Sequence, residues 1–405
     1  MTIPVSPPPA SKDPSRHSEL GTALGLALGP AVAIGLARFA YALLLPSMRS
    51  ALHWSFATAG AMNSANALGY LAGALSAASL VRRYGARPAF LVGLALTAAS
   101  LLATAGSANI AVLAGLRLLA GVSGAVSFIA GAGLVAQLGS LGSARRATLL
   151  LGVYFSGGGA GIVVSSLAIP ALLAATGAGA GWRWGWVALG VLSVLALAVS
   201  IPAALASREP PAPPTGSSRW PARRLAALLA GYGLFGAGYI AYMTFIVAFL
   251  KGEGAGTIET IWFWAVLGVA ATVGGFVWTP WVARLRGGRG TAAVLAVVTI
   301  GALLPLLSAS VVVAILSAVL FGGSFLTVVT AVTIAARRSL SPHHWTPAIA
   351  ALTAAFALGQ CAGPVLAGVL SDGPAGLRVG LWVSVGVLAA GSLVALTQRH
   401  HAERL

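Results

Sequence analysis

The feature that most constrains this sequence is a series of twelve long apolar segments, separated by short charged or Gly/Pro-containing breaks. A helix crosses the hydrocarbon core of a bilayer, about 30 Å thick, with about 20 apolar residues. The sequence therefore predicts an all-α membrane protein with twelve transmembrane helices. We expect them near residues 21–45, 57–81, 88–106, 110–138, 148–175, 185–206, 224–250, 259–283, 291–308, 311–336, 346–371 and 378–397.

Composition supports a membrane protein and excludes several other classes. Charged residues make up 8% of the chain, against about 25% in soluble domains. The net charge of +17 does not indicate nucleic acid binding, because the basic residues lie between apolar segments and do not gather on one polar face. The single Cys361 excludes an internal disulfide, and no Cys/His cluster predicts a metal site. We expect no cofactor.

The basic residues predict the orientation of the helices, since Lys and Arg beside membrane spans stay on the cytoplasmic side. With both termini cytoplasmic, eighteen basic residues lie inside, and two, Arg38 and Arg117, lie within predicted helices. The remaining four lie outside: Arg49, Arg183, Lys251 and Arg378.

The chain divides into two similar halves. Residues 1–20, rich in Pro and Ser, are expected to form a disordered cytoplasmic tail, and residues 398–405 a second tail. The Pro- and Ser-rich segment 207–223 predicts a cytoplasmic linker between six-helix halves at 21–206 and 224–397. The halves look like repeats, because Arg82, Gly85 and Arg87 after the second helix recur as Arg284, Gly287 and Arg289 after the eighth.

Four stretches carry a resemblance to a known family: GLARFAYALLLPSM (35–48), GVYFSGGGAGIVVSSLAIP (152–170), GYGLFGAGYIAYMTF (231–245) and GQCAGPVLAGVLSD (359–372). Together they resemble the major facilitator superfamily, and within it the YbfB/YjiJ-like branch of bacterial transporters. The resemblance implies the major facilitator fold, with two pseudo-symmetric halves that rock around a solute. It also implies a place in the cytoplasmic (inner) membrane of a bacterium.

Two further motifs concern solute movement and gating. RLLAG, from Arg117 to Gly121, is similar to the superfamily's Arg-x-x-x-Gly pattern, which is associated with solute or proton movement. The superfamily's loop signature after the second helix has an Asp that helps close the cytoplasmic gate, but Arg82 stands there in this chain. We expect the gate to be held differently, for example by Arg87 on helix-end carbonyls. The gating candidates are Arg82, Arg87, Arg284 and Arg289.

Arg38 and Arg117 are candidates for solute binding, because a charge inside the membrane is costly and normally faces a wet cavity or a partner. None of the seven acidic residues lies in the middle of a predicted helix, so an anionic solute would supply the missing counter-charge to a guanidinium. In the alternative interpretation, both arginines donate to backbone carbonyls at broken helices or fix the first helix against the fourth.

Other polar side chains extend the candidate site. Tyr41, Tyr239 and Tyr242 would form an aromatic, hydroxyl-bearing wall around a solute, or alternatively pack between helices or anchor at the interface. Asn63, Asn66, Tyr154 and Gln360 are expected to face a cavity or another helix. GGGAG, residues 157–161, is expected to be a helix-packing surface instead of a phosphate loop.

These features predict a secondary active transporter that moves a small organic anion by alternating access, with the lipid bilayer, the solute and a candidate coupling ion as partners. One rival is proton-coupled efflux of hydrophobic or cationic compounds. Another is a non-transporting membrane sensor. An enzyme is not expected, since no paired acids or nucleophile with a base is found.

Overall fold

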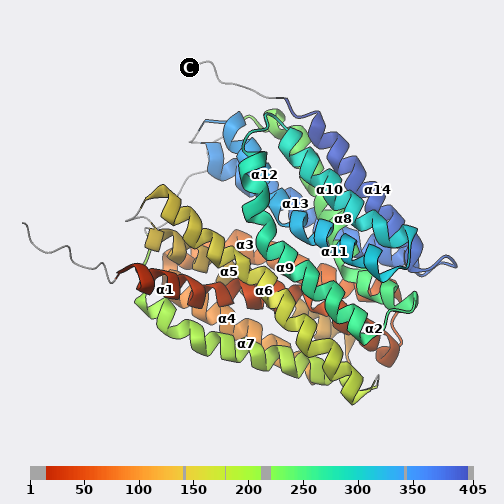
Figure 1. Ribbon diagram of the computed structural model, residues 1–405. Coiled ribbons are helices and arrows are strands. Elements are labelled where there is room, and N and C mark those ends of the chain that lie inside the picture. Colours follow the sequence, from red (N-terminus) through yellow and green to blue (C-terminus); the bar gives the residue numbers. More distant parts are fainter. Residues whose placement is uncertain (1–14, 140–142, 178, 211–219, 342–343, 400–405) are drawn as a thin grey trace, which may run out of the picture.

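A computed structural model describes residues 15–139, 143–177, 179–210, 220–341 and 344–399. Within these ranges, twelve helices are long and apolar enough to cross a membrane, so the predicted all-α fold with twelve spans is confirmed (Figure 1). The spans of the first half are α1 (Ser15–Pro30) with η1 (Ala31–Phe39) and α2 (Tyr41–Leu52), then α3 (Phe56–Tyr84), α4 (Ala86–Ala105), α5 (Ile110–Gly139), α6 (Ala144–Thr176) and α7 (Gly181–Ala206).

The second half also has six spans among the described residues. A short 3-10 helix, η2, leads into its first span, and its fourth span is made of two helices in succession, whereas in the first half the first span is interrupted. Its elements are η2 (Ala222–Leu225), α8 (Ala226–Gly252), α9 (Thr257–Val282), α10 (Arg289–Leu307), α11 (Val311–Phe325) with α12 (Thr327–Ser339), α13 (Trp345–Ser371) and α14 (Leu377–Leu396).

Two segment boundaries differ from those expected: η2 begins at Ala222, inside the predicted linker, and the first helix begins inside the predicted tail. Helix α1 begins at Ser15, so residues 15–20 are helical, in contrast to the predicted tail that extends to residue 20. Near its start, Glu19 forms an ion pair of 2.8 Å with Arg146 at the beginning of α6, which holds this first turn against the bundle. Residues 1–14 and 400–405, and 211–219 of the predicted linker, lie outside the described residues.

The first span changes its helical type in the middle. After Pro30, residues Ala31–Phe39 form a π-helix, and the Ala40 amide donates to the Gly35 carbonyl at 2.9 Å. Helix α6 packs tightly on this segment, because a Cβ added at Gly161 would lie 2.2 Å from the Ala31 carbonyl oxygen. The glycines of GGGAG therefore serve helix packing, with the same close approach at Gly157.

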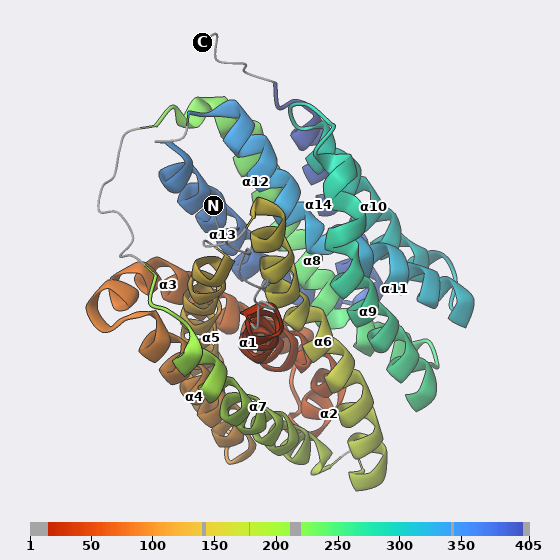
Figure 2. The same ribbon diagram turned by 60° about the vertical axis from the view of Figure 1, so that its left-hand side comes forward.

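The two halves join mainly where α3 packs on α13, α6 on α9, and α2 on α8, and α3 also meets α8. We call the end of the bundle that carries residues 207–210 and 220–222 the linker end, and the end that carries residues 52–56 and 371–377 the opposite end. The helices of the two halves run at an angle to each other, and the halves diverge toward the linker end (Figures 1 and 2).

The halves also repeat at the level of single contacts. Arg183, at the start of α7, donates from Nη1 to the Ala105 carbonyl at the end of α4 at 2.5 Å. Arg378, at the start of α14, donates from Nη2 to the Leu306 carbonyl near the end of α10 at 2.6 Å.

Large apolar side chains such as Val312 remain exposed on the outside of the bundle, which suits a surface that faces lipid tails.

Candidate functional site

Arg38 lies in the π-helix of the first span, where the two halves meet. Its side chain is buried, with 3% of the residue exposed, and its Nε and Nη2 have no hydrogen-bond partner in the described part of the chain. The guanidinium lies over the ring of Tyr70 in α3, with Cζ 5.1 Å from the ring centroid. Tyr239 of α8 and Cys361 of α13 also lie within electrostatic range, so Arg38 lies close to residues of both halves.

Aromatic rings from the second half form the opposing side of this site. Tyr239 stacks on Phe235 with 4.7 Å between ring centroids, on Phe356 at 5.5 Å and on Phe325 at 6.0 Å. Phe325 in turn meets the edge of Phe39, the residue after Arg38, at 5.7 Å. A ring stack from α8, α11 and α13 therefore reaches the first span.

Gln360 and Asn63 leave buried polar atoms near the junction of the halves. Gln360 of α13 donates from Nε2 to the Tyr239 hydroxyl, and its Oε1 is buried without a partner among the described residues. Asn63 of α3 donates to Thr244 Oγ1 of α8 at 2.5 Å, and Thr244 donates to the Ile240 carbonyl at 2.6 Å. Because the Thr244 proton is already used, Asn63 must be the donor, and its Oδ1 is the buried acceptor without a described partner.

Arg117 makes its described contacts inside the first half, and like Arg38 it has a buried Nε and Nη2 without a partner among the described residues. Its Nη1 donates to the Ala37 carbonyl of the π-helix at 2.5 Å, and its Cζ lies 4.9 Å from the centroid of Tyr41 and 5.4 Å from that of Trp186. Arg117 therefore ties the fourth span to a carbonyl of the broken first helix, which is the contact that the alternative interpretation of this residue expects.

The remaining predicted site residues also direct their polar groups into their own half. Each has a hydrogen-bond partner on a neighbouring helix, so these groups stabilise helix packing within a half. The bonds are Tyr41 Oη to the Ala59 carbonyl at 2.8 Å, Asn66 Nδ2 to the Arg117 carbonyl at 3.1 Å, Tyr154 Oη to the Phe128 carbonyl at 2.7 Å, and Tyr242 Oη with Ser317 Oγ at 2.7 Å.

Comparison with known proteins identifies the family. The family model described as "Uncharacterised MFS-type transporter YbfB" matches residues 30–396. The chain belongs to this family. The predicted family is thus confirmed, and the protein is a transporter, not an enzyme. No curated protein has a sequence that matches the chain.

Solved structures of transporters share the fold of this YbfB-type chain. A bacterial homologue of the human lysosomal transporter Spinster, in an inward-facing and unoccupied conformation, has a TM-score of 0.72 at 16% identity, over 95% of this chain and 97% of that one. A mutant form of the nucleoside transporter NupG has a TM-score of 0.75 at 13% identity, over 93% of this chain and 99% of that one. At these identities the likeness concerns the fold alone.

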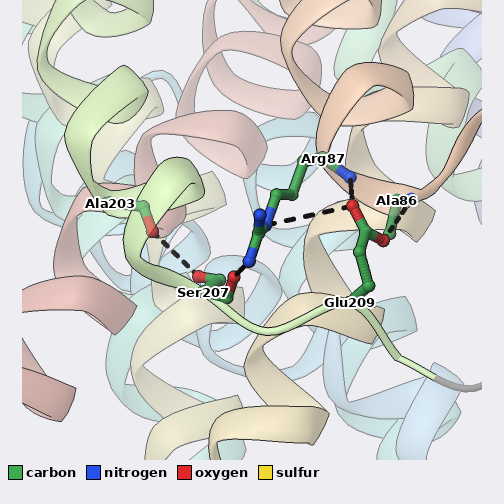
Figure 3. A network of polar contacts seen from close by, with 5 residues as sticks. All are labelled: Ala86, Arg87, Ala203, Ser207 and Glu209. Atoms are coloured by element: carbon green, nitrogen blue, oxygen red, sulfur yellow. Dashed lines mark hydrogen bonds and ion pairs between the residues drawn. The ribbon is translucent and has the colours of Figure 1, made fainter.

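The gating candidate Arg87 lies in a polar network at the linker end (Figure 3). Gly85, with φ of +91°, makes the turn between α3 and α4. Glu209 accepts hydrogen bonds from the first amides of α4, at 2.7 Å from Ala86 N and 3.0 Å from Arg87 N. The Arg87 side chain donates to the Ser207 carbonyl at the end of α7, and its Nε lies 3.9 Å from Glu209. Arg87 thus binds a helix-end carbonyl, but that helix belongs to the same half.

The other gating candidates in this YbfB-type transporter have fewer contacts. Arg82 donates to Ser79 Oγ on its own helix at 3.0 Å, and Arg284 and Arg289 are exposed. In the second half it is Arg338 that binds loop carbonyls, those of Leu285 at 3.0 Å and Ala283 at 2.6 Å. The gating role of all four candidates stays a prediction.

Two residues, one beside Arg38 and one that joins the two halves, were not predicted from the sequence. Tyr70 lies beneath the Arg38 guanidinium, and Asp372 binds the amino-terminal end of α3 from the second half. No sequence spacing relates Tyr70 to Arg38. For Asp372 a signal was available, since it is one of only seven acids and directly follows a predicted helix.

Proposed function

We propose that this transporter moves a small organic anion between its two halves by alternating access, with Arg38 binding the anionic group. The observation that carries the proposal is the environment of Arg38, which is buried at the junction of the halves with two unpartnered nitrogens. A buried guanidinium without a counter-charge is costly. A carboxylate or phosphate of the solute would pair with both nitrogens in a bidentate contact.

The acids of the protein do not supply that counter-charge in the part of the chain that the structure describes. Each described acid lies near a helix end, outside the middle of the spans. The described acids are Glu19, Glu209, Glu253, Glu259 and Asp372.

The basic residues support an orientation with the linker end in the cytoplasm. Arg87, Arg146 and Arg338 lie at this end, together with most other described arginines, whereas Arg49, Arg183, Lys251 and Arg378 lie at the opposite end. Because basic residues beside spans stay cytoplasmic, we propose both termini on the cytoplasmic side of a bacterial inner membrane.

The ring stack favours a second candidate function, efflux of hydrophobic or cationic compounds. Tyr239, Phe235 and Phe356 present aromatic surface at the junction of the halves, and aromatic faces also attract cations. Proton coupling would require a titrating group, and uptake or efflux measured against pH in proteoliposomes separates this function from anion transport.

The test of the anion proposal is a thermal-shift screen of the purified protein against organic anions, organic cations and neutral sugars. A ligand at 100 times its Kd stabilises the folded state by about 2.7 kcal/mol. We expect anions to raise Tm for the wild type and for Arg183→Gln, whose arginine lies at the opposite end, but not for Arg38→Gln. Shifts with cations or neutral solutes only would overturn the proposal.

Flux measurements then address the sensor alternative. Wild-type protein in liposomes is expected to move the stabilising anion across the membrane, and Arg38→Gln is expected to lose this flux. A protein that binds the anion but moves none of it would be a sensor.

A further inference from the structure

A carboxylate of the second half binds the start of α3, which belongs to the first half. Asp372, which follows α13, accepts hydrogen bonds from the backbone amides of Phe56 at 2.6 Å and Ala57 at 3.0 Å. Phe56 is the first residue of α3, and 316 positions separate it from Asp372 in the sequence. The contact therefore joins the two halves at the opposite end.

The chemistry of a helix start explains why this contact stabilises the closed arrangement. The first amides of a helix have no partner within it and carry partial positive charge. Ser55 satisfies the third residue, since its Oγ accepts from the Thr58 amide at 3.1 Å. Asp372 satisfies the two amides before it with charge-assisted hydrogen bonds. Separation of the halves would break both of these bonds.

Close packing continues from this contact toward the candidate site. A Cβ added at Gly368 of α13 would lie 2.4 Å from the Phe56 carbonyl oxygen, and one added at Gly60 of α3 would lie 2.1 Å from the Pro364 carbonyl oxygen. One turn further along α3, Asn63 bonds to Thr244 across the halves. Arg38 and Tyr70 lie beyond this closed region, on its linker-end side.

The carboxylates at other helix ends bind within one half. Glu19 pairs with Arg146 in the first half, Glu209 binds the start of α4 in the first half, and Glu253 lies 3.9 Å from Arg378 in the second. Asp372 differs because its partner helix belongs to the other half.

We propose that Asp372 is a positioning residue for transport: its bonds to the start of α3 hold the opposite end closed, and they must break before the site opens to that side. The proposal rests on alternating access, but it does not depend on the charge of the solute. Removing the carboxylate should therefore shift the protein toward the state that is open at the opposite end.

Cys361, the only cysteine of the chain, reports the side from which the site is reached. It is half-buried on α13 near Arg38, and it lies on the linker-end side of the contacts of Pro364 and Gly368. We would label it with a membrane-impermeant maleimide, added to one side or the other of sealed vesicles of known orientation. Wild-type protein is expected to react from the side of the linker end.

The expected result for Asp372→Ala is a roughly tenfold or larger rise in the labelling rate from the side of the opposite end, the population change expected when charge-assisted hydrogen bonds are lost. Asp372→Asn keeps an acceptor without the charge and should give a smaller rise. Gly368→Ala should also raise labelling from that side, because its methyl group would separate α13 from Phe56. This variant keeps the test valid if Asp372→Ala does not fold.

The matched control is Glu209→Ala, which removes the same kind of helix-start contact inside one half. It should lower thermal stability and leave the labelled side unchanged. The proposal is overturned if folded Asp372 variants and Gly368→Ala still react only from the side of the linker end. Labelling requires no solute, so failure of the anion proposal would not affect this result.

Discussion

At the scale of single residues, Arg38 and Arg117 show how position decides the role of a buried charge. Both are almost fully buried arginines within membrane spans. Arg117 donates to a π-helix carbonyl and lies against Tyr41 and Trp186, all in the first half. Nε and Nη2 are buried without a described partner in both arginines, but Arg38 lies within electrostatic range of Tyr239 and Cys361 of the second half. We therefore expect Arg117 to serve helix packing, and we propose solute binding for Arg38.

Replacement of Arg117 tests this distinction. Arg117→Leu leaves the Ala37 carbonyl without its side-chain donor, and a buried unsatisfied polar group costs about 1–3 kcal/mol. We expect a lower Tm with the anion-induced shift retained, measured by thermal unfolding in detergent. The neighbouring Leu118→Ala, at a partly exposed position, should have a smaller effect. Normal stability together with a lost anion shift would instead place Arg117 in the solute site.

At the scale of elements, the π-helix and its contact with α6 position Arg38. A π-helix is rare and often occurs at functional sites. Here it follows Pro30, which has no backbone N–H to donate, and it runs to Phe39. Gly161 allows the α6 backbone to approach this segment closely. The position of Arg38 therefore depends on a packing contact between two helices of the first half.

A pair of glycine variants on α6 tests that contact. The added methyl group of Gly161→Ala would lie 2.2 Å from the Ala31 carbonyl oxygen, whereas that of Gly158→Ala would lie 3.5 Å from Ile34 Cγ2, an ordinary contact distance. Overpacking costs about 1–3 kcal/mol. We expect Gly161→Ala to lower Tm and flux in proteoliposomes, and Gly158→Ala to leave both near the wild-type values. Equal behaviour of the two variants would contradict this account.

At the scale of the whole molecule, charge distribution and packing divide the bundle into two unlike ends. The linker end carries most of the described arginines, whereas Asp372 and the first turns of α3 close the opposite end. The two ends therefore differ in their relation to the membrane and in the contacts that join the halves.

Reporter fusions test the proposed orientation. A green fluorescent protein fused after Leu405 should fluoresce, because it folds in the cytoplasm, and alkaline phosphatase inserted at Gly254, between α8 and α9, should be active outside. Fluorescence and phosphatase activity in intact cells are the measurements. Alkaline phosphatase fused after Leu405 is the control and should be inactive. The reverse pattern would invert the orientation.

The sequence by itself determined the class of protein, the number of spans and the family. Apolar length is a local property that the bilayer thickness imposes on each helix, so the spans were predictable without knowledge of their neighbours. The four motif stretches, from Gly35 to Asp372, likewise identified the family without a structure. The start of α1 at Ser15 was missed because the predicted boundary followed apolar composition, whereas this turn is polar and is held by the Glu19–Arg146 ion pair.

Only the tertiary structure decided which polar side chains meet. Of the predicted residues, it brings Arg38, Tyr239 and Gln360 together at the junction of the halves, and it directs Tyr41 and Tyr242 into separate halves. The physical reason is that lipid tails are as apolar as the helix interfaces. Hydrophobicity therefore does not tell which side of a transmembrane helix faces the site, and contacts such as that of Asp372 with the start of α3 arise only when the helices pack.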